Sequence, residues 1–412
     1  MKYSSYYLKT NKEAKSLESI NATLLQKGGF VEQVMAGVYA FLPIGLRVLN
    51  KIETIVREEM DKVGSELLLP ALSPKSLWEQ SGRLNTIDVL FEVRGANDLA
   101  RAKNSASYIL NPTQEEIMTT IVRHYAMSYK DLPLAVYQIQ TKFRSEPRAK
   151  SGLMRGREFR MKDLYSFHET AEDLDRFYDE MKSVYARVFD RMGLGHATHL
   201  TLAGGGDFTS NFSHEFQTVC ETGEDIIFYD EKEKIWKNKE VASEELQKTA
   251  ESVRASEVGN IYRFGTKYSD SFDHIITQQN GDKSAVHTGS YGIGTSRLMG
   301  VLVEKFHDEK GIMWPESVAP FTVYLAGLNR DDDATIAAAD AAYTALEEAG
   351  VETLYDDRDT GTGAKFADAE LLGIPWRVVV SKKTAGKLEV TSRATNETHL
   401  LEISEFLKKA GK

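Results

Sequence analysis

The chain has 412 residues, of which 42% are hydrophobic and 27% are charged, and its formal net charge is -10. Such values are typical of a soluble globular protein with two or three domains of roughly 100–200 residues each, and no apolar run approaches the roughly 18 residues that a membrane-spanning helix needs. Because the N-terminus has no apolar signal region and Cys220 is the only cysteine, we expect a cytoplasmic protein with no internal disulfide and no cysteine-based zinc site.

The first regular pattern in the chain is a helix followed by a short strand. Apolar residues recur at helical spacing over residues 45–63, Pro43 suits a helix start, and residues 66–70 form an apolar run that ends at Pro70. This pair could serve as a packing or dimer element, and an ordinary amphipathic core helix explains the same residues equally well.

The stretch LNPTQEE, residues 110–116, offers a candidate binding site for a small ammonium group. In an extended chain Thr113 and Glu115 lie on one side, where a hydroxyl and a carboxylate can hold such a group. A helix N-terminus with acidic residues in its first turn is the alternative, and these residues taken alone favour it.

Residues 136–163 change to a period of two, which predicts a long hairpin of antiparallel strands with a flexible basic loop. Residues 142–163 carry eight Lys or Arg, against two Glu before the closing aspartate. Such a segment can bind the phosphates and base of a nucleotide, although a solvated charged hairpin is favoured by these residues alone. The polar face of the first strand holds Arg144 and Glu146, and one face of the second holds Arg155, Arg157, Phe159, Met161 and Asp163.

The next segments are less regular. A helical pattern covers about residues 174–192, and the highly charged residues 231–256 indicate an exposed helix or a linker. GSYGIG, residues 289–294, leads into an amphipathic helix with Arg297 in its first turn, at an end that favours anions; an arginine on the helix surface is an equal alternative. His168 and His214 have no metal-ligand spacing, and each is interpreted as structural.

The last part of the chain predicts a separate small α/β domain. From residue 321 onward strands and helices alternate over about ninety residues, which is typical of such a domain. We place the boundary near Ala319-Pro320, which divides the chain into residues 1–319 and 320–412. Residues 321–412 are acidic by count, so any RNA contact there requires a local basic patch.

The order of these segments resembles that of a bacterial-type prolyl-tRNA synthetase, a class II aminoacyl-tRNA synthetase. GVYAFLPIGLRVLNKIETIVREEMDKVGSELLLP is similar to the first class II motif, FRSE with MRGREFRMKDLYSFH to the second, and GSYGIGTSR to the third. NPTQEE, SHEF, ETGED, EVGNIYRFGTKYS and HDEKGIMWPESVAP resemble stretches particular to the prolyl enzymes. LYDDRDTGTGAKFADAELLGIP resembles their anticodon-binding domain, so the resemblance covers nearly the whole chain.

The resemblance implies an α+β catalytic domain built on an antiparallel sheet, followed by a small α/β anticodon-binding domain. It implies a homodimeric proline–tRNA ligase that uses ATP and Mg²⁺ to form prolyl-adenylate and then charges tRNA(Pro). The magnesium is expected on the phosphates rather than on dedicated protein ligands. The rival hypotheses are a catalytically silent paralogue that binds RNA and a class II synthetase for another amino acid, although a threonyl enzyme would need zinc ligands that the sequence does not clearly supply.

The resemblance also implies roles for individual residues. Arg144 and Arg297 are expected to be catalytic. The expected ATP-binding residues are Arg144, Glu146, Arg155, Phe159 and Arg297. The expected proline-binding residues are Thr113, Glu115, Arg144, Met161, Asp163, His214 and Ser290. For tRNA, the candidate contacts are Arg358, Lys365 and Phe366.

The chain departs from the family pattern in four places. Residues 209–212 replace two glycines and a serine before SHEF, Ser290 replaces a common cysteine, and Lys150 replaces a common arginine. The largest departure is that only residues 231–256 occupy the place of an editing domain. Because a small apolar difference is worth only about 1–3 kcal/mol in a pocket, we expect alanine to be activated without being edited in cis.

Overall fold

The computed structural model describes residues 1–7, 9–12, 17–206, 212–329 and 331–411. The chain divides into two compact units. The large-sheet unit comprises residues 35–38 and 53–301, and the small-sheet unit comprises residues 1–34, 39–52 and 302–412. The boundary near residue 320 stays a prediction. Among the described residues, no helix is both long enough and apolar enough to span a lipid bilayer.

The large-sheet unit is built on one mostly antiparallel sheet. In the described residues nine strands follow the order β10-β9-β12-β11-β13-β16-β8-β7-β3, and β10 also pairs with β13. The strands are β3 (Ser65–Glu66), β7 (Leu134–Phe143), β8 (Glu158–His168), β9 (Thr198–Ala203), β10 (Ser213–Val219), β11 (Asp225–Asp230), β12 (Ile235–Asn238), β13 (Ser252–Gly265) and β16 (His287–Ile293). The predicted hairpin is therefore β7 and β8, in the middle of a larger sheet.

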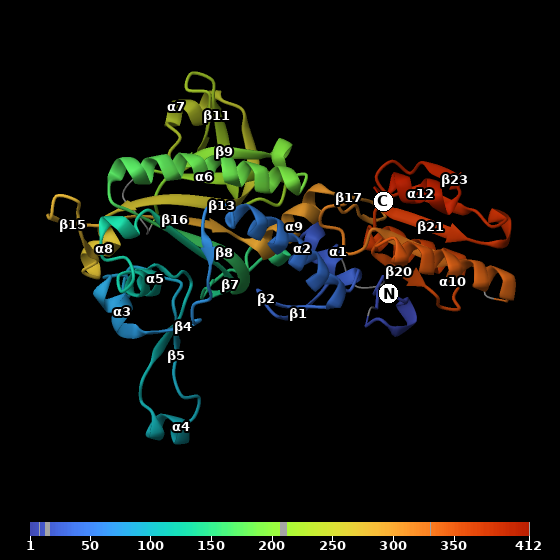
Figure 1. Cartoon of the computed structure of the whole chain (residues 1–412), viewed down its shortest axis with the longest axis horizontal. Coiled ribbons are helices and arrows are strands. Elements are labelled where there is room, and N and C mark those ends of the chain that lie inside the picture. The colour runs from blue at the N-terminus through green and yellow to red at the C-terminus, as the bar shows by residue number, and fades with distance from the viewer. Residues whose placement is uncertain (8, 13–16, 207–211, 330, 412) are drawn as a thin grey trace. The chain divides into compact units, whose positions relative to one another are not determined.

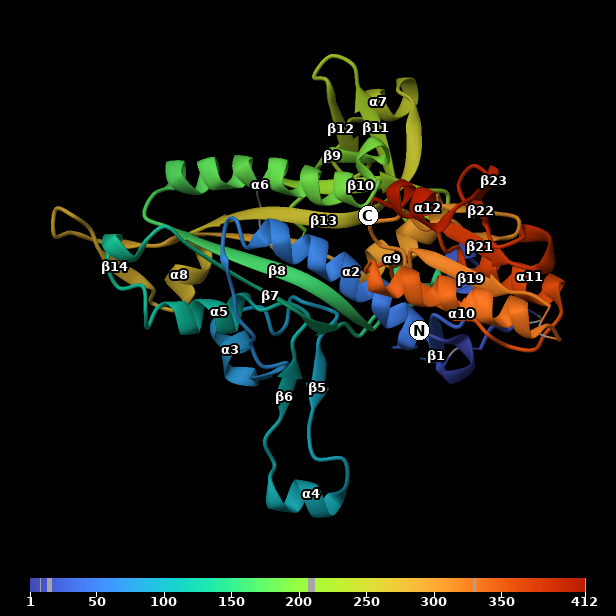
Figure 2. The same ribbon diagram turned by 45° about the vertical axis from the view of Figure 1, so that its right-hand side comes forward.

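Helix α6 (Ala171–Arg191) covers one face of this sheet, where it lies along β13, β16 and β8 (Figure 2). The Thr170 hydroxyl accepts a hydrogen bond from the Asp173 amide at 3.2 Å, which caps the first turn. Leu174, Tyr178 and Met181, together with further residues at helical spacing, are buried against the sheet. Because the helix shields this face, the opposite face remains available for a site.

Shorter elements complete the large-sheet unit. They are α3 (Lys75–Gln80), α5 (Glu115–Val122), α8 (Lys267–Ser271), the β14 (Ile275–Thr277) and β15 (Lys283–Ala285) hairpin, and the sheet β4 (Leu72–Pro74), β6 (Tyr108–Leu110) and β5 (Phe91–Val93). Helix α4 (Asp98–Lys103) lies at the tip of the projecting β5–β6 hairpin (Figure 1). Trp78, Ile87 and Ile109 form a small core beneath that hairpin.

The first predicted helix is α2 (Pro43–Met60), which contributes residues to both units. The strand predicted over residues 66–70 is shorter, because β3 comprises only two residues. Beyond it the Leu67 amide bonds the Tyr137 carbonyl at 2.8 Å, and the Leu69 amide bonds the Gln138 side chain at 3.0 Å. The Gln138 side chain thus accepts the hydrogen bond that a neighbouring strand's backbone carbonyl would accept in a regular sheet.

The prediction of an exposed helix or linker over residues 231–256 is only partly right, because helix α7 (Glu244–Thr249) has no buried residue but two strands flank it. These residues contain β12, α7 and the first residues of β13. Strand β12 pairs with β11 from Ile227↔Asn238 to Asp230↔Ile235 and runs parallel to β9. The charged residues indicated an exposed segment because most of their side chains are exposed. The backbone of β12 nevertheless pairs with β11 and β9 in the sheet.

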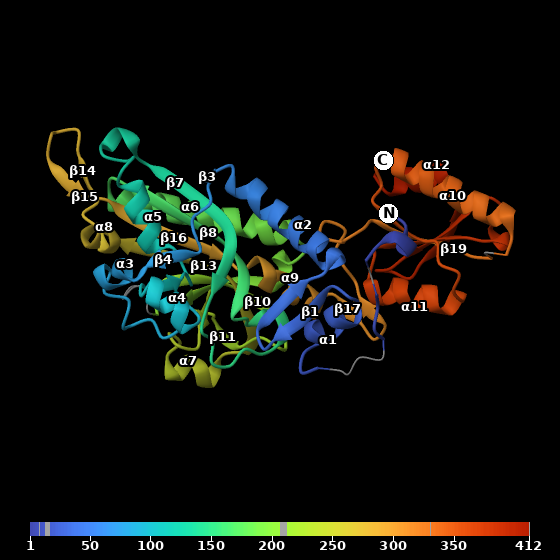
Figure 3. The ribbon, with the colours of Figure 1, turned by 90° about the horizontal axis from the view of Figure 1, so that it is seen from below.

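The small-sheet unit carries a second sheet with the order β20-β19-β21-β22-β23. Its elements are β19 (Val323–Gly327), α10 (Asp333–Glu348), β20 (Thr353–Asp356), α11 (Thr362–Leu372), β21 (Trp376–Val380), β22 (Leu388–Ser392), β23 (Thr398–Leu401) and α12 (Ile403–Lys409). Figure 3 shows α10 and α12 on one side of β19 and α11 on the other. The predicted alternation of strands and helices is present, and β23 is a further strand that was not predicted. The other elements that reach this unit are α1 (Ile20–Lys27), β1 (Val31–Met35), β2 (Val38–Phe41), α9 (Thr295–Lys305), β17 (His307–Asp308) and β18 (Gly311–Ile312).

Candidate active site

Strand register places polar side chains in a row across the open face of the large sheet. Asp163 of β8 lies opposite Gln138 of β7 and Gly292 of β16, and Gly292 lies opposite Asn260 of β13. Directly opposed residues share one face of a sheet. The polar alternation predicted in β7 therefore faces the same side as Asp163, and it is buried there instead of solvated.

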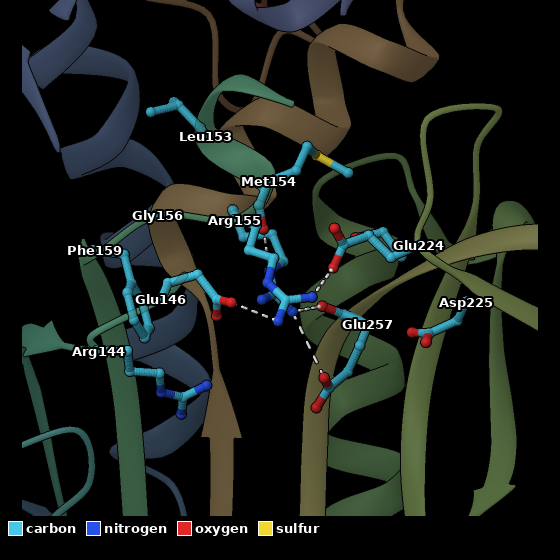
Figure 4. Close-up of a pocket in the computed structure, with 12 residues that line it drawn as sticks. Arg144, Glu146, Leu153, Met154, Arg155, Gly156, Phe159, Glu224, Asp225 and Glu257 are labelled. Atoms are coloured by element: carbon cyan, nitrogen blue, oxygen red, sulfur yellow. Dashed lines mark hydrogen bonds and ion pairs between the residues drawn. The ribbon is translucent and has the colours of Figure 1, made fainter. Parts of the chain in front are cut away.

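Two adjoining pockets open on this face. The outer pocket, of about 220 Å³, is lined by Arg144, Glu146, Leu153, Met154, Arg155, Gly156, Phe159, Glu224, Asp225, Ser256, Glu257 and Arg297 (Figure 4). The inner pocket, of about 210 Å³, is lined by Thr113, Glu115, Arg144, Phe159, Met161, Asp163, Glu257, Val258, Gly259, Asn260, Tyr262, Ser290, Gly292, Gly294 and Arg297. Arg144 lines both. All five predicted ATP-binding residues line the outer pocket, and all the predicted proline-binding residues except His214 line the inner one.

Arg144 lies at the junction of the two pockets, directly after β7. Its guanidinium carbon is 5.1 Å from the centre of the Phe159 ring. Among the described residues no carboxylate lies within 4.0 Å of this guanidinium. Burial, and next the nearby Arg297 cation, lower the pKa of Arg144. A cation between two pockets with no described carboxylate in direct contact is suited to bind an anion that enters either one.

Arg155 closes the outer pocket by bridging two carboxylates (Figure 4). Its Nη2 contacts Glu146 at 2.7 Å and its Nη1 contacts Glu224 at 2.7 Å. Arg157 lies outside the pocket and donates to the backbone carbonyls of Glu146 and Ala36, so it holds the loop in place. An incoming nucleotide must replace the carboxylate partners of Arg155 if that arginine is to bind phosphate.

Arg297 lies in the first turn of α9, and its guanidinium is held by the backbone. Its Nε donates to the Met154 carbonyl at 2.8 Å and its Nη1 donates to the Glu257 carbonyl at 2.5 Å. The Glu257 carboxylate is 3.7 Å away. The alternative of an arginine on the helix surface is thus wrong, because this side chain lines both pockets.

The ammonium-binding candidates meet in the inner pocket. The Thr113 hydroxyl donates to Oε2 of Glu115 at 2.6 Å, and the Ser290 hydroxyl donates to Oε1 at 3.3 Å. Helix α5 begins at Glu115 and carries acidic residues in its first turn, as the alternative interpretation expected. The helix interpretation is confirmed, and the same helix end forms a wall of the pocket. Binding of an ammonium group by Thr113 and Glu115 stays a prediction.

Asp163 is held by groups that the sequence interpretation did not single out. The fully buried Lys142 places its Nζ 3.0 Å from Oδ1 of Asp163, and Tyr165 donates to Oδ2 at 2.9 Å. Burial lowers the pKa of Lys142, and Asp163 opposes that change. The available signal was the spacing of two between Asp163 and Tyr165, since alternate residues of a strand share a face.

Strand β13 supplies pocket residues that the sequence interpretation missed. Glu257, Asn260 and Tyr262 line the inner pocket, and the buried Glu215 of β10 contacts Asn260 at 3.5 Å. Burial, and then Glu257, raise the pKa of Glu215 to about 8. Only the pairing of β13 with β16 and β10 brings these side chains to the site, and no local pattern signals it.

The prediction that His214 lines the proline pocket is wrong. Its Nδ1 contacts the Tyr178 hydroxyl of α6 at 2.8 Å, on the face of the sheet that α6 covers. Its neighbour Glu215 lies on the opposite face, because successive strand residues alternate. The exposed Phe212 lies at the start of this strand, and residues 209–211 lie outside the described residues.

The other cations of residues 142–163 are mostly paired within the chain. Lys150 contacts Glu224 at 3.3 Å, and Arg160 contacts Glu53 at 2.9 Å. The fully buried Lys162 donates to the Tyr185 hydroxyl on the α6 side. The interpretation of a solvated charged hairpin is therefore wrong for most of this segment.

The structure also corrects one predicted RNA contact. Lys365 is fully buried in the small-sheet unit, where its Nζ donates to the carbonyls of Gly327 and Asp356 at 2.8 and 2.9 Å. It shares a helix face with Ala369 and Leu372, which are also buried. Arg358 keeps a quarter of its side chain exposed but pairs with Asp356 and Asp368. Phe366 is half-buried, with the Arg377 guanidinium 4.3 Å from its ring centre.

Metal-binding groups are scarce in the part of the chain that is described. Among those residues no cluster of three or more His, Cys, Asp or Glu is arranged to hold a metal ion. Asp225 and Glu257 line the outer pocket beside its arginines, and carboxylate oxygens are suitable ligands for Mg²⁺. A magnesium ion carried by phosphate groups would find these two acceptors beside it.

Comparisons with known proteins agree with this geometry. The family model "tRNA synthetase class II core domain (G, H, P, S and T)" matches residues 95–306, and "Anticodon binding domain" matches residues 322–412. Solved structures share the fold at TM-scores of 0.78 for the Giardia lamblia prolyl-tRNA synthetase in complex with prolyl-adenylate and 0.79 for the Cryptosporidium parvum enzyme complexed with halofuginone and AMPPNP. They are 21% and 20% identical, covering 94% and 95% of this chain and 75% and 76% of their own. The predicted class II core with an anticodon-binding domain is confirmed.

Sequence similarity over nearly the whole chain identifies the family, which the shared fold alone does not. The proline–tRNA ligase of Caulobacter sp. strain K31 is 40% identical over 441 residues, covering 99% of this chain and 97% of its own. That of Wolbachia sp. subsp. Drosophila simulans is 40% identical over 430 residues, covering 99% of both. These lengths leave no room for a large inserted domain, as the sequence predicted. The chain belongs to the proline–tRNA ligase family of class II aminoacyl-tRNA synthetases.

Proposed function

We propose that this chain activates proline with ATP to form prolyl-adenylate and then transfers the prolyl group to the 3′ end of tRNA(Pro). The observation that carries the proposal is Arg144, a guanidinium without a carboxylate partner among the described residues, placed between two polar pockets. Both anions that react in this step, the α-phosphate and the amino-acid carboxylate, need a shared cation at such a junction.

In this proposal the inner pocket binds proline. The carboxylate of Glu115, flanked by Thr113 and Ser290, accepts from the secondary ammonium group. Met161 supplies an apolar side chain beside the ring, and Asp163 lines the same wall. Proline then points its carboxylate toward Arg144.

The outer pocket binds ATP in the same proposal. Phe159 stacks on the adenine ring, Glu146 accepts from the exocyclic amine, and Arg155 and Arg297 hold the outer phosphates. Arg155 leaves Glu146 as the nucleotide enters, which frees that carboxylate for the base. Asp225 and Glu257 would offer oxygen ligands to a magnesium ion that enters with the phosphates, and the ion would further neutralise their charge.

The chemistry requires two transfers. A proline carboxylate oxygen attacks the α-phosphorus in line, the bond to the bridging oxygen of the β-phosphate breaks, and pyrophosphate leaves. A hydroxyl of the terminal adenosine then attacks the prolyl carbonyl and AMP leaves. Arg144 stabilises the charge that develops on the α-phosphate, so positioning and electrostatics supply most of the catalysis.

We further propose that the protein acts in the cytoplasm as a homodimer that binds tRNA(Pro) through its C-terminal domain. Two large apolar side chains beside β3 and β4 support dimerisation, since Leu68 is 76% exposed and Leu72 is 44% exposed. Arg358 and Phe366 remain the candidate RNA contacts, while the burial of Lys365 removes it from that set.

We also propose that alanine is activated and is not edited in cis. Support comes from the short path between β11 and β13, which holds only β12 and α7 as regular elements. A pocket that accepts proline excludes a smaller apolar residue by only about 1–3 kcal/mol. Rapid hydrolysis of Ala-tRNA(Pro) by the purified protein would contradict this part of the proposal.

The deciding experiment is amino-acid-dependent ATP–pyrophosphate exchange with proline, alanine, cysteine and threonine. We expect strong exchange with proline, weaker exchange with alanine, and subsequent charging of tRNA(Pro). Exchange that prefers threonine would indicate a synthetase for another amino acid. No exchange from folded dimeric protein would indicate a catalytically silent paralogue.

A further inference from the structure

The two carboxylates at the start of α5 share one buried arginine. Nη1 of Arg83 lies 3.1 Å from Oε2 of Glu115 and 3.0 Å from Oε1 of Glu116. Each of the three side chains is at most 3% exposed. Of the three, only Glu115 lines the inner pocket, so Arg83 contacts the pocket wall from behind.

The surroundings hold this guanidinium at a defined place. It lies between two aromatic rings, with its central carbon 5.4 Å from the ring centre of Trp78 in α3 and 5.6 Å from that of Tyr268 in α8. Gly82 precedes it with a φ of +75°, a conformation that favours glycine and that turns the chain after α3. Ser81 donates to Glu116 at 2.9 Å and fixes the second carboxylate.

The two oxygens of Glu115 have different partners. Oε2 accepts from the buried Arg83 and from the Thr113 hydroxyl. Oε1 receives only the long 3.3 Å contact from Ser290 among the hydrogen bonds of the described residues. One oxygen is therefore anchored, and the other retains accepting capacity for a cation in the pocket.

We propose that Arg83 is a positioning residue for proline binding, which holds the ammonium-accepting carboxylate of Glu115 in place through Oε2. The inference rests on the proposed function. Without the bond from Arg83, Oε2 of Glu115 would keep only the Thr113 hydroxyl as an anchor, and the carboxylate would present Oε1 to the secondary ammonium of proline in a less defined position. Arg83 also pairs with Glu116, so both buried carboxylates at the start of α5 have the same cationic partner.

The test uses three variants of the full-length protein in ATP–pyrophosphate exchange. We expect Arg83→Met to raise the KM for proline about 10- to 100-fold, the value of one hydrogen bond to a charged group, with less than about threefold change in the KM for ATP. Arg83→Lys should recover part of the loss, because a single nitrogen makes both contacts. Arg123→Met is the matched control, since Arg123 links the end of α5 to the Phe272 carbonyl after α8 without touching Glu115.

The control should lower the melting temperature and leave the KM for proline unchanged. An unaltered proline KM in Arg83→Met, or equal increases in the proline and ATP KM values, would overturn the inference. If Arg83→Met does not fold, Arg83→Gln decides, because it removes the charge and keeps a polar side chain: a selective rise in proline KM supports positioning, and a wild-type value overturns it. Absence of proline-dependent exchange in the wild type would instead refute the proposed function, so the two failures are distinguishable.

Discussion

Replacement of Arg144 by methionine should remove activity without destabilising the fold. Arg144 lies between both pockets, and no described carboxylate is paired with it. In the proposed reaction its planar fork makes two charge-assisted hydrogen bonds, each worth about 1.5–3 kcal/mol. Their sum, about 3–6 kcal/mol, corresponds to a loss of roughly 10²- to 10⁴-fold in kcat/KM.

The same substitution should have little effect on the free energy of unfolding. Arg144 sits where burial and Arg297 lower its pKa, so the folded state gains little from its charge. Methionine retains the length and the packing on Phe159 and leaves no described carboxylate unpaired. We therefore expect the unfolding free energy to stay within about 1 kcal/mol of the wild-type value.

Arg160→Met is the matched control, because it removes a cation from the same hairpin that does have a partner. Arg160 contacts both oxygens of the mostly buried Glu53, at 2.9 and 3.0 Å. Loss of this pair should cost about 1–3 kcal/mol after allowance for the partial exposure of Arg160. Proline-dependent pyrophosphate exchange and urea unfolding measure the two effects. A kcat/KM for Arg144→Met within tenfold of wild type, or a stability loss equal to that of Arg160→Met, would refute the reasoning.

Three further predictions concern buried charge and the surface. Glu215→Gln should become more stable relative to wild type as pH rises from 5 to 8: with a folded pKa of about 8, wild-type Glu215 keeps a proton that the unfolded chain releases, so wild-type stability falls across this window. Urea unfolding at pH 5.5 and 8.5 checks this, and a constant difference would contradict it. Lys365→Met should lose about 2–4 kcal/mol of stability because the carbonyls of Gly327 and Asp356 lose their donor; calorimetry measures this, and intact stability with impaired tRNA binding would restore the original assignment. Leu68→Asp should dissociate the proposed dimer into 46.2-kDa monomers in sedimentation velocity, whereas an unchanged sedimentation coefficient would move the interface elsewhere.

Local patterns in the sequence predicted the main elements, and the resemblance to a known family implied most members of the site. The period of two in residues 136–163 predicted β7 and β8, and the helical period predicted α6, because side-chain burial on one face imposes these spacings. The order of motifs identified Arg144, Phe159 and Arg297, and the structure brings these three residues to one pair of pockets. Short-range spacing is sufficient for the elements because each of these segments folds as one strand or one helix.

Only the tertiary structure decided which charges are paired and which face of each element is covered. Alternation in β10 separates His214 from Glu215, but the position of α6 determines that His214 lies away from the pocket. Lys365 is a charged residue in sequence, and the packing of α11 makes it a buried donor. Arg83 reaches Glu115 only because α3 packs against α5, across thirty-two positions of the chain. Such pairings depend on contacts between distant segments, which no local pattern of side chains can specify.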